Sequence, residues 1–438
     1  MTQKFNYKTK EELLRAADKC GVALPWSDDT EILKTSHRIG DSNVVIPNSL
    51  TVHPMEGFDS TPDGAPSELT FRRGKRMASG GAGLVWLEAT AVVKEGRTNE
   101  GQLWITRDNL DSFKRLAEEM HKCNDGAPLI LQLTHSGRFS RRDNKPAPVI
   151  SYHNPVMNEK FMIDPDYPVA TDEYLDSLPE KFGEAAKMAK EAGFDGADVK
   201  CCHKYLFSEL LSAYTREGRY GGSFENRTRL FVNSIKAAAV HADKNFIIAS
   251  RFGPYDCIPY PWGFAADHDD YLKIDWEEPD KLYKIMYENG VRLVDMTLGS
   301  PYYNPHVNRP YDNGGYEPPE EKLVGVARLI NASAHMKATV PGITLIGTGY
   351  TYLRKFAPNV AAGALSNGMI DCAGFGRMAF AYPTFAEDIL AGRELDLHKV
   401  CLTCSKCTSL MRAMSCTGCP IRDTEMYLPI YQKVFANK

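Results

Sequence analysis

The sequence lacks any apolar run of about 18 residues, the minimum length that predicts a membrane-spanning helix. Its first residues, MTQKFNYKTKEELLRAADK, are polar and do not contain the apolar core of a signal peptide. We therefore expect a soluble, cytoplasmic protein that has no membrane partner.

The sequence also lacks a strong charge of one sign. It has 52 Lys and Arg residues against 56 Asp and Glu residues, and the basic residues are scattered along the chain. Because a nucleic-acid partner needs a clustered basic surface, we expect none. A Rossmann fingerprint is missing too, since the cluster Gly80-Gly-Ala-Gly83 precedes a strand-like run instead of following one.

Alternating strand-like and helix-like segments are present instead. Four helix-like segments, at 108–122, 179–193, 223–242 and 319–336, repeat their apolar residues at three- and four-residue spacing. Short apolar runs that alternate with such helices favour a parallel sheet with right-handed crossovers. There are eight such runs, at 44–55, 82–92, 128–135, 194–202, 246–253, 291–299, 342–350 and 369–377.

Eight such units predict an α/β fold of the (β/α)₈ TIM-barrel type. We place the barrel at 41–398, an N-terminal helical extension at 1–40, and a cysteine-rich C-terminal segment at 399–438. The long loops 136–172 and 253–277 follow strands, so they belong to the C-terminal face, where barrel enzymes carry out their chemistry.

Glycines follow the seventh and eighth strands, in Gly347-Thr-Gly349 and Gly374-Phe-Gly376-Arg377. In TIM barrels these two loops commonly bind a phosphate through backbone N–H groups, and Arg377 can add a charged hydrogen bond. The alternative is that these glycines serve only to make tight turns.

The fourth strand ends in Asp198-Val-Lys200-Cys-Cys-His203-Lys-Tyr205. Strand alternation directs Lys200 into the barrel mouth, where a buried lysine is costly unless it meets an anion or a carbonyl oxygen. The alternative is a lysine whose head reaches solvent. We expect no metal at Cys201, Cys202 and His203, because neighbouring residues on a strand point to opposite faces.

Five of the 11 cysteines fall within 401–419. In a reducing compartment, cysteines at two-residue spacing indicate a metal or a cluster more than disulfides.

Several motifs together resemble the Old Yellow Enzyme family of FMN-dependent oxidoreductases. The resemblance covers nearly the whole barrel and implies a TIM barrel that binds FMN. Its motifs are His53-Pro54-Met55, Glu88-Ala89-Thr90, Gln132-Leu-Thr-His135-Ser-Gly137-Arg138, His203-Lys-Tyr205-Leu and Tyr220-Gly-Gly-Ser-Phe-Glu225-Asn226-Arg227.

The resemblance also implies the FMN contacts. Backbone groups of Pro54 and Met55 would contact the ring system, and Ala89 and Gln132 would lie at its pyrimidine edge. Arg251 would stabilise the anionic reduced flavin near N1 and O2. The phosphate would be held by Gly349, Gly376 and Arg377.

At the fourth strand the family places two donors to a substrate carbonyl, followed by a tyrosine that donates a proton. Lys200 and His203 stand at the donor positions and Tyr205 at the tyrosine position, although the family usually has histidine where Lys200 stands. Glu56, near the position of flavin N5, either tunes the flavin or is a solvated carboxylate. His306 either assists Tyr205 or is structural.

Relatives of this family with a cysteine cluster after the barrel, the trimethylamine dehydrogenases and 2,4-dienoyl-CoA reductases, bind one [4Fe-4S] centre there. The spacing of Cys401, Cys404, Cys407 and Cys419 is similar to that pattern. Zinc and unmetallated thiols are the alternatives, and Cys416 is an extra thiol. A cluster would relay single electrons between FMN and a separate redox protein.

The resemblance therefore predicts an FMN-dependent ene reductase that uses NAD(P)H or a redox partner to reduce a small α,β-unsaturated carbonyl compound or acid. The first alternative is an FMN/Fe-S amine dehydrogenase or demethylase, and the second is a flavin-binding redox sensor or scaffold without turnover.

Aromatic residues of the rim loops would either form flat walls for the substrate or only pack the loops. They are Tyr255, Tyr260, Trp262, Phe264, Tyr302, Tyr303, Tyr311 and Tyr316. The sequence leaves the oligomeric state open between a monomer and a homo-oligomer.

Overall fold

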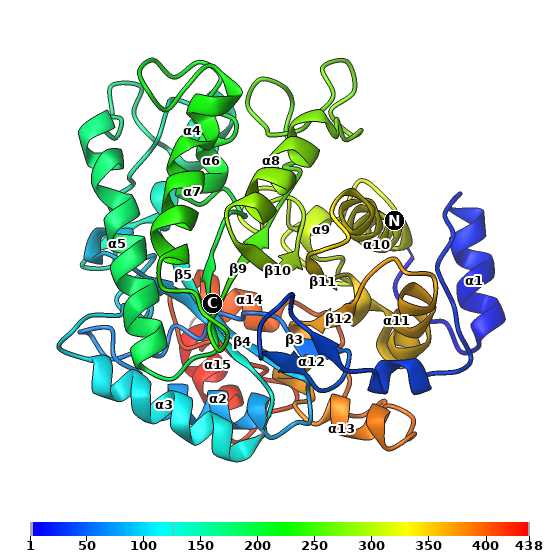
Figure 1. Ribbon diagram of the computed structural model, residues 1–438. Helices are drawn as coiled ribbons and strands as arrows, with labels where there is room; N and C mark the ends of the chain where they lie inside the picture. The colour runs from blue at the N-terminus through cyan, green and yellow to red at the C-terminus, as the bar shows by residue number, and fades with distance from the viewer. Residues whose placement is uncertain (1–2, 125, 437–438) are drawn as a thin grey trace.

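The computed structural model describes residues 3–124 and 126–436 and contains a closed barrel of eight parallel strands (Figure 1). The strands follow one another around the barrel in chain order, and β12 pairs with β3 to close it. They are β3 (Leu50–Val52), β4 (Leu84–Ala91), β5 (Leu129–Thr134), β8 (Gly196–Val199), β9 (Ile247–Phe252), β10 (Val291–Met296), β11 (Thr344–Gly347) and β12 (Cys372–Phe375). Each lies within one of the eight predicted runs, so the TIM-barrel prediction is confirmed.

Helices surround the barrel and include the four that the sequence predicted, which correspond to α3, α5, α7 and α10 (Figure 1). Helix α5 begins earlier than predicted, because the Thr171 side chain caps it by accepting a hydrogen bond from Tyr174 N, and Pro179 lies inside the helix. The surrounding helices are α2 (Glu68–Ala78), α3 (Leu110–Cys123), α5 (Asp172–Glu191), α7 (Phe224–Ala239), α8 (Glu277–Glu288), α10 (Lys322–Thr339), α11 (Ala357–Ser366) and α13 (Phe385–Leu390).

One end of the barrel is closed by apolar packing. The antiparallel pair β1 (His37–Arg38) and β2 (Val45–Ile46) lies there, and Ile39 and Ile46 pack with side chains from the barrel strands such as Trp86. Since side chains fill this end, a ligand site in the mouth of the barrel would lie at the opposite end, at the carboxyl termini of the strands.

The loops at that opposite end carry short elements. The loop 136–172 contains β6 (Arg141–Arg142), β7 (Lys145–Pro146) and α4 (Pro155–Phe161), and further helices follow β8, β10 and β12. These helices are α6 (Leu206–Leu210), α9 (Pro305–Asn308) and α12 (Arg377–Ala381).

The N-terminal extension contains helix α1 (Lys10–Lys19), which Thr9 caps. Its neighbouring segment is attached to the barrel by Phe5, whose backbone N–H donates to Asp312 Oδ1 at 3.0 Å and whose ring lies edge-on to Tyr352.

The cysteine-rich segment contains α14 (Lys406–Arg412) and α15 (Tyr427–Phe435) and folds back against the barrel. Arg72 of α2 donates two hydrogen bonds to the Asp423 carboxylate, at 2.7 and 2.8 Å. The N–H of Thr417 donates to Gly57 O at 2.6 Å. Since Gly57 follows β3, these contacts bring the segment to the carboxyl end of the barrel.

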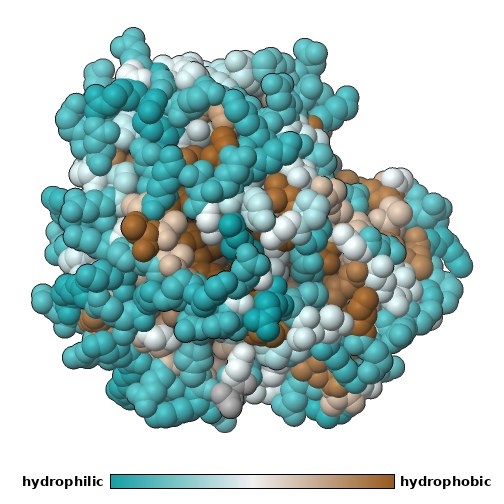
Figure 2. Space-filling model, viewed as in Figure 1, coloured by the Kyte–Doolittle hydropathy of each residue, from teal (hydrophilic) through white to brown (hydrophobic). Residues whose placement is uncertain are grey.

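No helix in 3–124 or 126–436 is long and apolar enough to cross a membrane. On the face shown in Figure 2, apolar residues form separate patches between areas of hydrophilic surface.

Candidate active site

Two adjoining cavities lie at the carboxyl ends of the strands. The inner cavity has a volume of about 120 Å³, and the glycine-lined cavity has a volume of about 90 Å³. The inner cavity is lined by Pro54, Glu56, Gln132, Lys200, His203, Tyr205 and Tyr302, among others, and the glycine-lined cavity by His53, Thr348, Gly349, Thr351, Gly374 and Gly376. Five residues line both cavities, namely Met55, Arg251, Asn308, Arg309 and Arg377.

Lys200 follows β8 and is buried, with 4% of its surface exposed. Its Nζ lies 3.9 Å from Glu56 Oε1 and 3.8 Å from the centroid of the Tyr205 ring. Burial lowers the pKa of Lys200, and the Glu56 carboxylate opposes that shift. The alternative of a lysine that reaches bulk solvent is therefore wrong.

His203 is held in an orientation fixed by two neighbours. Its Nε2 lies 3.2 Å from Asn308 Nδ2 and 3.3 Å from Thr297 Oγ1. Burial lowers the pKa of His203 well below its usual value, and the positive charges of Arg251 and Lys200 lower it further. The imidazole is therefore neutral, and an Nε2 that accepts from the Asn308 amide leaves the proton on Nδ1.

The hydroxyl of Tyr205 is part of a buried hydrogen-bond network. It donates to Glu56 Oε1 at 2.9 Å and lies 2.9 Å from the hydroxyl of Tyr302. Burial raises the pKa of Tyr205 well above its usual range, and the charge of Glu56 adds to the shift. The phenol is thus protonated throughout the physiological pH range, as a proton donor must be.

Arg251 on β9 and Gln132 on β5 are positioned by buried carboxylates of the neighbouring strands β10 and β8. Arg251 Nη1 donates to Pro54 O at 3.1 Å, and Arg251 Nε lies 3.3 Å from Asp295 Oδ2. The Gln132 side chain donates through Nε2 to Asp198 Oδ2 at 2.6 Å. One of its two N–H groups is engaged there, so its carbonyl oxygen can accept a hydrogen bond from a ligand and its second N–H can donate one.

The glycine-lined cavity has the properties of an anion site. Arg377 Nη2 donates to Pro310 O at 2.8 Å, whereas its buried Nη1 has no hydrogen-bond partner among the described residues. Gly349 has a φ of 111°, which a side chain would strain, and a Cβ on Gly376 would approach Met55 Sδ to 2.8 Å. An unpaired guanidinium nitrogen beside glycines fits a phosphate, so these residues fit the phosphate of FMN.

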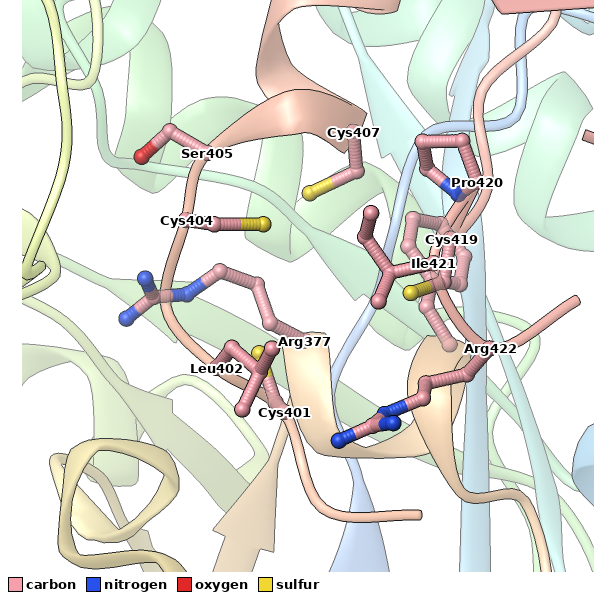
Figure 3. A pocket seen from close by; sticks show the side chains of 11 residues that line it. Arg377, Cys401, Leu402, Cys404, Ser405, Cys407, Cys419, Pro420, Ile421 and Arg422 are labelled. Atoms are coloured by element: carbon pink, nitrogen blue, oxygen red, sulfur yellow. The ribbon is translucent and has the colours of Figure 1, made fainter. Parts of the chain in front are cut away.

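A smaller third cavity, the cysteine cavity, lies beside the inner cavity. Figure 3 shows the sulfur atoms of Cys401, Cys404, Cys407 and Cys419 directed toward the space that they surround. Cys416 does not line it. Arg377 and Cys407 line both the cysteine cavity and the inner cavity.

No group of three or more His, Cys, Asp or Glu side chains within the described residues is arranged to hold a single metal ion. Zinc holds its thiolates at about 2.3 Å, which requires them to converge closely.

Other predicted residues lie outside the cavities. Ala89 is fully buried, and its carbonyl accepts from Gln102 Nε2. His306 lines neither the inner cavity nor the glycine-lined cavity, and its Nδ1 lies 2.5 Å from the hydroxyl of Tyr316. Of the eight aromatic residues predicted for the rim, only Tyr302 lines the inner cavity, and several of the others pack the loops.

Sequence reasoning missed the residues that reach the inner cavity from elsewhere. Asn308 and Arg309 come from the end of α9, and Thr408, Met411 and Thr417 come from the cysteine-rich segment. Burial and the neighbouring Arg377 lower the pKa of Arg309.

A profile of the NADH:flavin oxidoreductase / NADH oxidase family matches residues 38–396. An NADPH dehydrogenase from Listeria monocytogenes serotype 4b (strain CLIP80459) is 32% identical over 264 residues, which cover 59% of this chain and 71% of the relative.

Several solved structures share the fold of this chain. A 2-naphthoyl-CoA reductase in complex with 2-naphthoyl-CoA matches with a TM-score of 0.71, 21% identity and 90% coverage of this chain. The histamine dehydrogenase from Rhizobium sp. 4-9 has a TM-score of 0.68, 21% identity and 89% coverage. An old yellow enzyme homologue from Zymomonas mobilis has a TM-score of 0.61, 20% identity and 83% coverage, and the chain covers 94% of it. The chain spans only 57% and 52% of the first two structures.

Proposed function

The chain belongs to the NADH:flavin oxidoreductase / NADH oxidase family, and we propose that it is an ene reductase, which reduces the C=C bond of an α,β-unsaturated carbonyl compound or acid. The observation that carries this proposal is the arrangement of Lys200, His203 and Tyr205 around the inner cavity. Two donors and a protonated phenol lie there beside the residues that fit FMN.

FMN, when bound, supplies a hydride for the β-carbon, and NAD(P)H is the expected source of those two electrons. The chain supplies the remaining groups. Lys200 and His203 donate hydrogen bonds to the substrate's carbonyl or carboxylate oxygen, which withdraws electron density from the alkene. Tyr205 gives its proton to the α-carbon, so that one hydride and one proton are added across the double bond.

Two neighbours prepare Tyr205 for this step. Glu56 and Tyr302 hold its hydroxyl in place, at 2.9 Å each. When the proton leaves, the Lys200 ammonium lies over the ring and stabilises the phenolate. In this proposal Glu56, whose side chain is 13% exposed, positions the proton donor Tyr205.

The four thiols of the cysteine cavity would hold a [4Fe-4S] cluster, which transfers single electrons when present. Cys407 would lie between the cluster and the inner cavity, and a redox protein would be an additional electron donor.

A second candidate function, amine oxidation, is favoured by one observation. Glu56 places a carboxylate in the inner cavity, where it could bind a substrate ammonium group. The Lys200 ammonium, 3.9 Å away, repels such a group, and we therefore favour the carbonyl substrate.

Lys200→Met tests this choice. For an ene reductase we expect kcat/KM for an enone or enoate to fall about 100-fold, because one preorganised donor to the developing charge is lost. Flavin reduction by NAD(P)H is expected to change little. The measurement is stopped-flow kinetics of the two half-reactions.

Lys244→Met is the matched control, because Lys244 is exposed and lies beside Asp41, at the closed end of the barrel. If Lys200→Met instead leaves alkene reduction unchanged and accelerates amine oxidation, the amine alternative is correct. Glu56→Gln would then abolish that amine oxidation.

A further inference from the structure

A larger cavity, here called the outer chamber, adjoins the inner cavity and has a volume of about 520 Å³. Tyr302 and Met411 line both. Its walls come from the loop 136–172, from residues 302–316 after β10, from the cysteine-rich segment, and from Phe58 and Thr98. A ligand whose reacting end lies in the inner cavity therefore has space for a second part beyond Tyr302.

The charged residues of the outer chamber all have the same sign. Arg141, Lys160 and Arg412 line it, and no Asp or Glu does so. The fourth basic residue, Arg138, is neutralised by a buried ion pair with Glu209. None of the other three makes an ion pair within the described part of the chain.

Two of these cations interact unfavourably with each other. Lys160 Nζ donates to Tyr303 O at 2.8 Å and lies 4.7 Å from the centroid of the Tyr303 ring, so at least one of its three N–H groups is already engaged. Burial lowers the pKa of Lys160, and the like charge of Arg412 lowers it further. A bound anion would relieve this repulsion.

The rest of the outer chamber is suited to an apolar group. The Phe139 ring stacks on Tyr302 at 4.0 Å and lies edge-on to Phe161 at 5.2 Å. At the same chamber Met162 is 92% exposed and Met414 is 37% exposed. Flexible thioethers can adapt to ligands of different shape.

We propose that the outer chamber binds the tail of an amphipathic substrate, with its apolar part against Phe139 and Tyr302 and a terminal anionic group, a carboxylate or a phosphate, between Arg141, Lys160 and Arg412. A neutral or cationic tail would leave the three charges uncompensated. This inference deepens the proposed function, because it gives the class of substrate for the same site.

The test is binding of non-reactive probes to the holoenzyme, measured by calorimetry. The probes are 4-phenylbutanoate, 4-phenylbutyl phosphate and the neutral 4-phenylbutanamide. We expect the better anion to bind about tenfold more tightly than the amide, and this advantage to shrink as salt is added. Whichever anion binds better identifies the tail as a carboxylate or a phosphate.

The double variant Lys160→Gln/Arg412→Gln should remove most of the advantage and leave amide binding unchanged. Lys244→Gln, which changes a distant exposed lysine, should have no effect. Equal binding of all three probes to the unaltered protein would overturn the inference. An anion preference that survives in the double variant would overturn it too, because the anion would then lie elsewhere, for example near Lys200.

Turnover separates this inference from the proposed function. If the anion preference depends on Lys160 and Arg412 but no alkene is reduced, the outer chamber stands and the ene reductase proposal fails. If alkenes are reduced, but anionic and neutral tails differ in neither KM nor probe affinity, the ene reductase proposal stands and the outer-chamber inference fails.

Discussion

Tyr205→Phe is expected to slow alkene reduction by about 10²- to 10⁴-fold, because it removes the proton donor and leaves the ring in place. Flavin reduction by NAD(P)H needs no proton from this hydroxyl and should keep its rate. Stopped-flow measurement of the two half-reactions, each observed through flavin absorbance, gives both rates in the same preparation.

Tyr302→Phe provides the control. The Tyr302 hydroxyl lies 2.9 Å from that of Tyr205 and helps to position it. Loss of one hydrogen bond should therefore cost alkene reduction about tenfold or less. Equal slowing of both half-reactions in Tyr205→Phe would remove this tyrosine from the role of proton donor.

Cys419→Ser is expected to abolish the bound cluster. Protein purified without oxygen should contain about four irons per FMN, and this variant should contain almost none, because a [4Fe-4S] cluster needs all four thiolates. Iron, zinc and FMN are quantified in the same sample.

Cys416→Ser is the matched control, since Cys416 lies three residues earlier and does not line the cysteine cavity. It should keep its iron. FMN without iron in the unaltered protein, or one zinc per chain, would contradict the cluster. Loss of iron in Cys416→Ser but not in Cys419→Ser would contradict the ligand assignment.

The barrel itself could be predicted because its signal is local. Parallel strands buried on both faces are runs of apolar residues, as in Leu84–Ala91, and the helices between them repeat at 3.6 residues. Strand alternation predicted that Lys200 points into the barrel mouth, and the cost of burying its charge predicted a nearby anion or carbonyl oxygen. In the structure, the Glu56 carboxylate lies 3.9 Å from its Nζ.

The remaining features of the site depend on contacts between residues far apart in sequence. Tyr205 meets Glu56 across 149 positions, and no local pattern indicates that contact. The same holds for the cysteine-rich segment, whose Met411 and Thr417 reach the inner cavity because Asp423 binds Arg72 of α2. Cysteine spacing predicted a shared ligand site but not the position of that site beside the inner cavity.

Two residues to which the resemblance gave a role beside the flavin or the substrate do not line the inner cavity or the glycine-lined cavity. Ala89 matches a family position at the flavin edge, but its side chain lies in the core and not in a cavity wall. His306, for which the sequence left two roles open, contacts the Tyr316 hydroxyl and does not line the inner cavity with Tyr205.

The most direct test of the central claim is anaerobic mixing of the fully reduced protein with enones and enoates, and of the oxidised protein with primary and methylated amines. We predict that an α,β-unsaturated carbonyl compound or acid reoxidises the flavin in a single turnover and yields the saturated product, while amines leave the oxidised spectrum unchanged. Bleaching of the flavin by an amine, with no reoxidation by any alkene, would contradict the account.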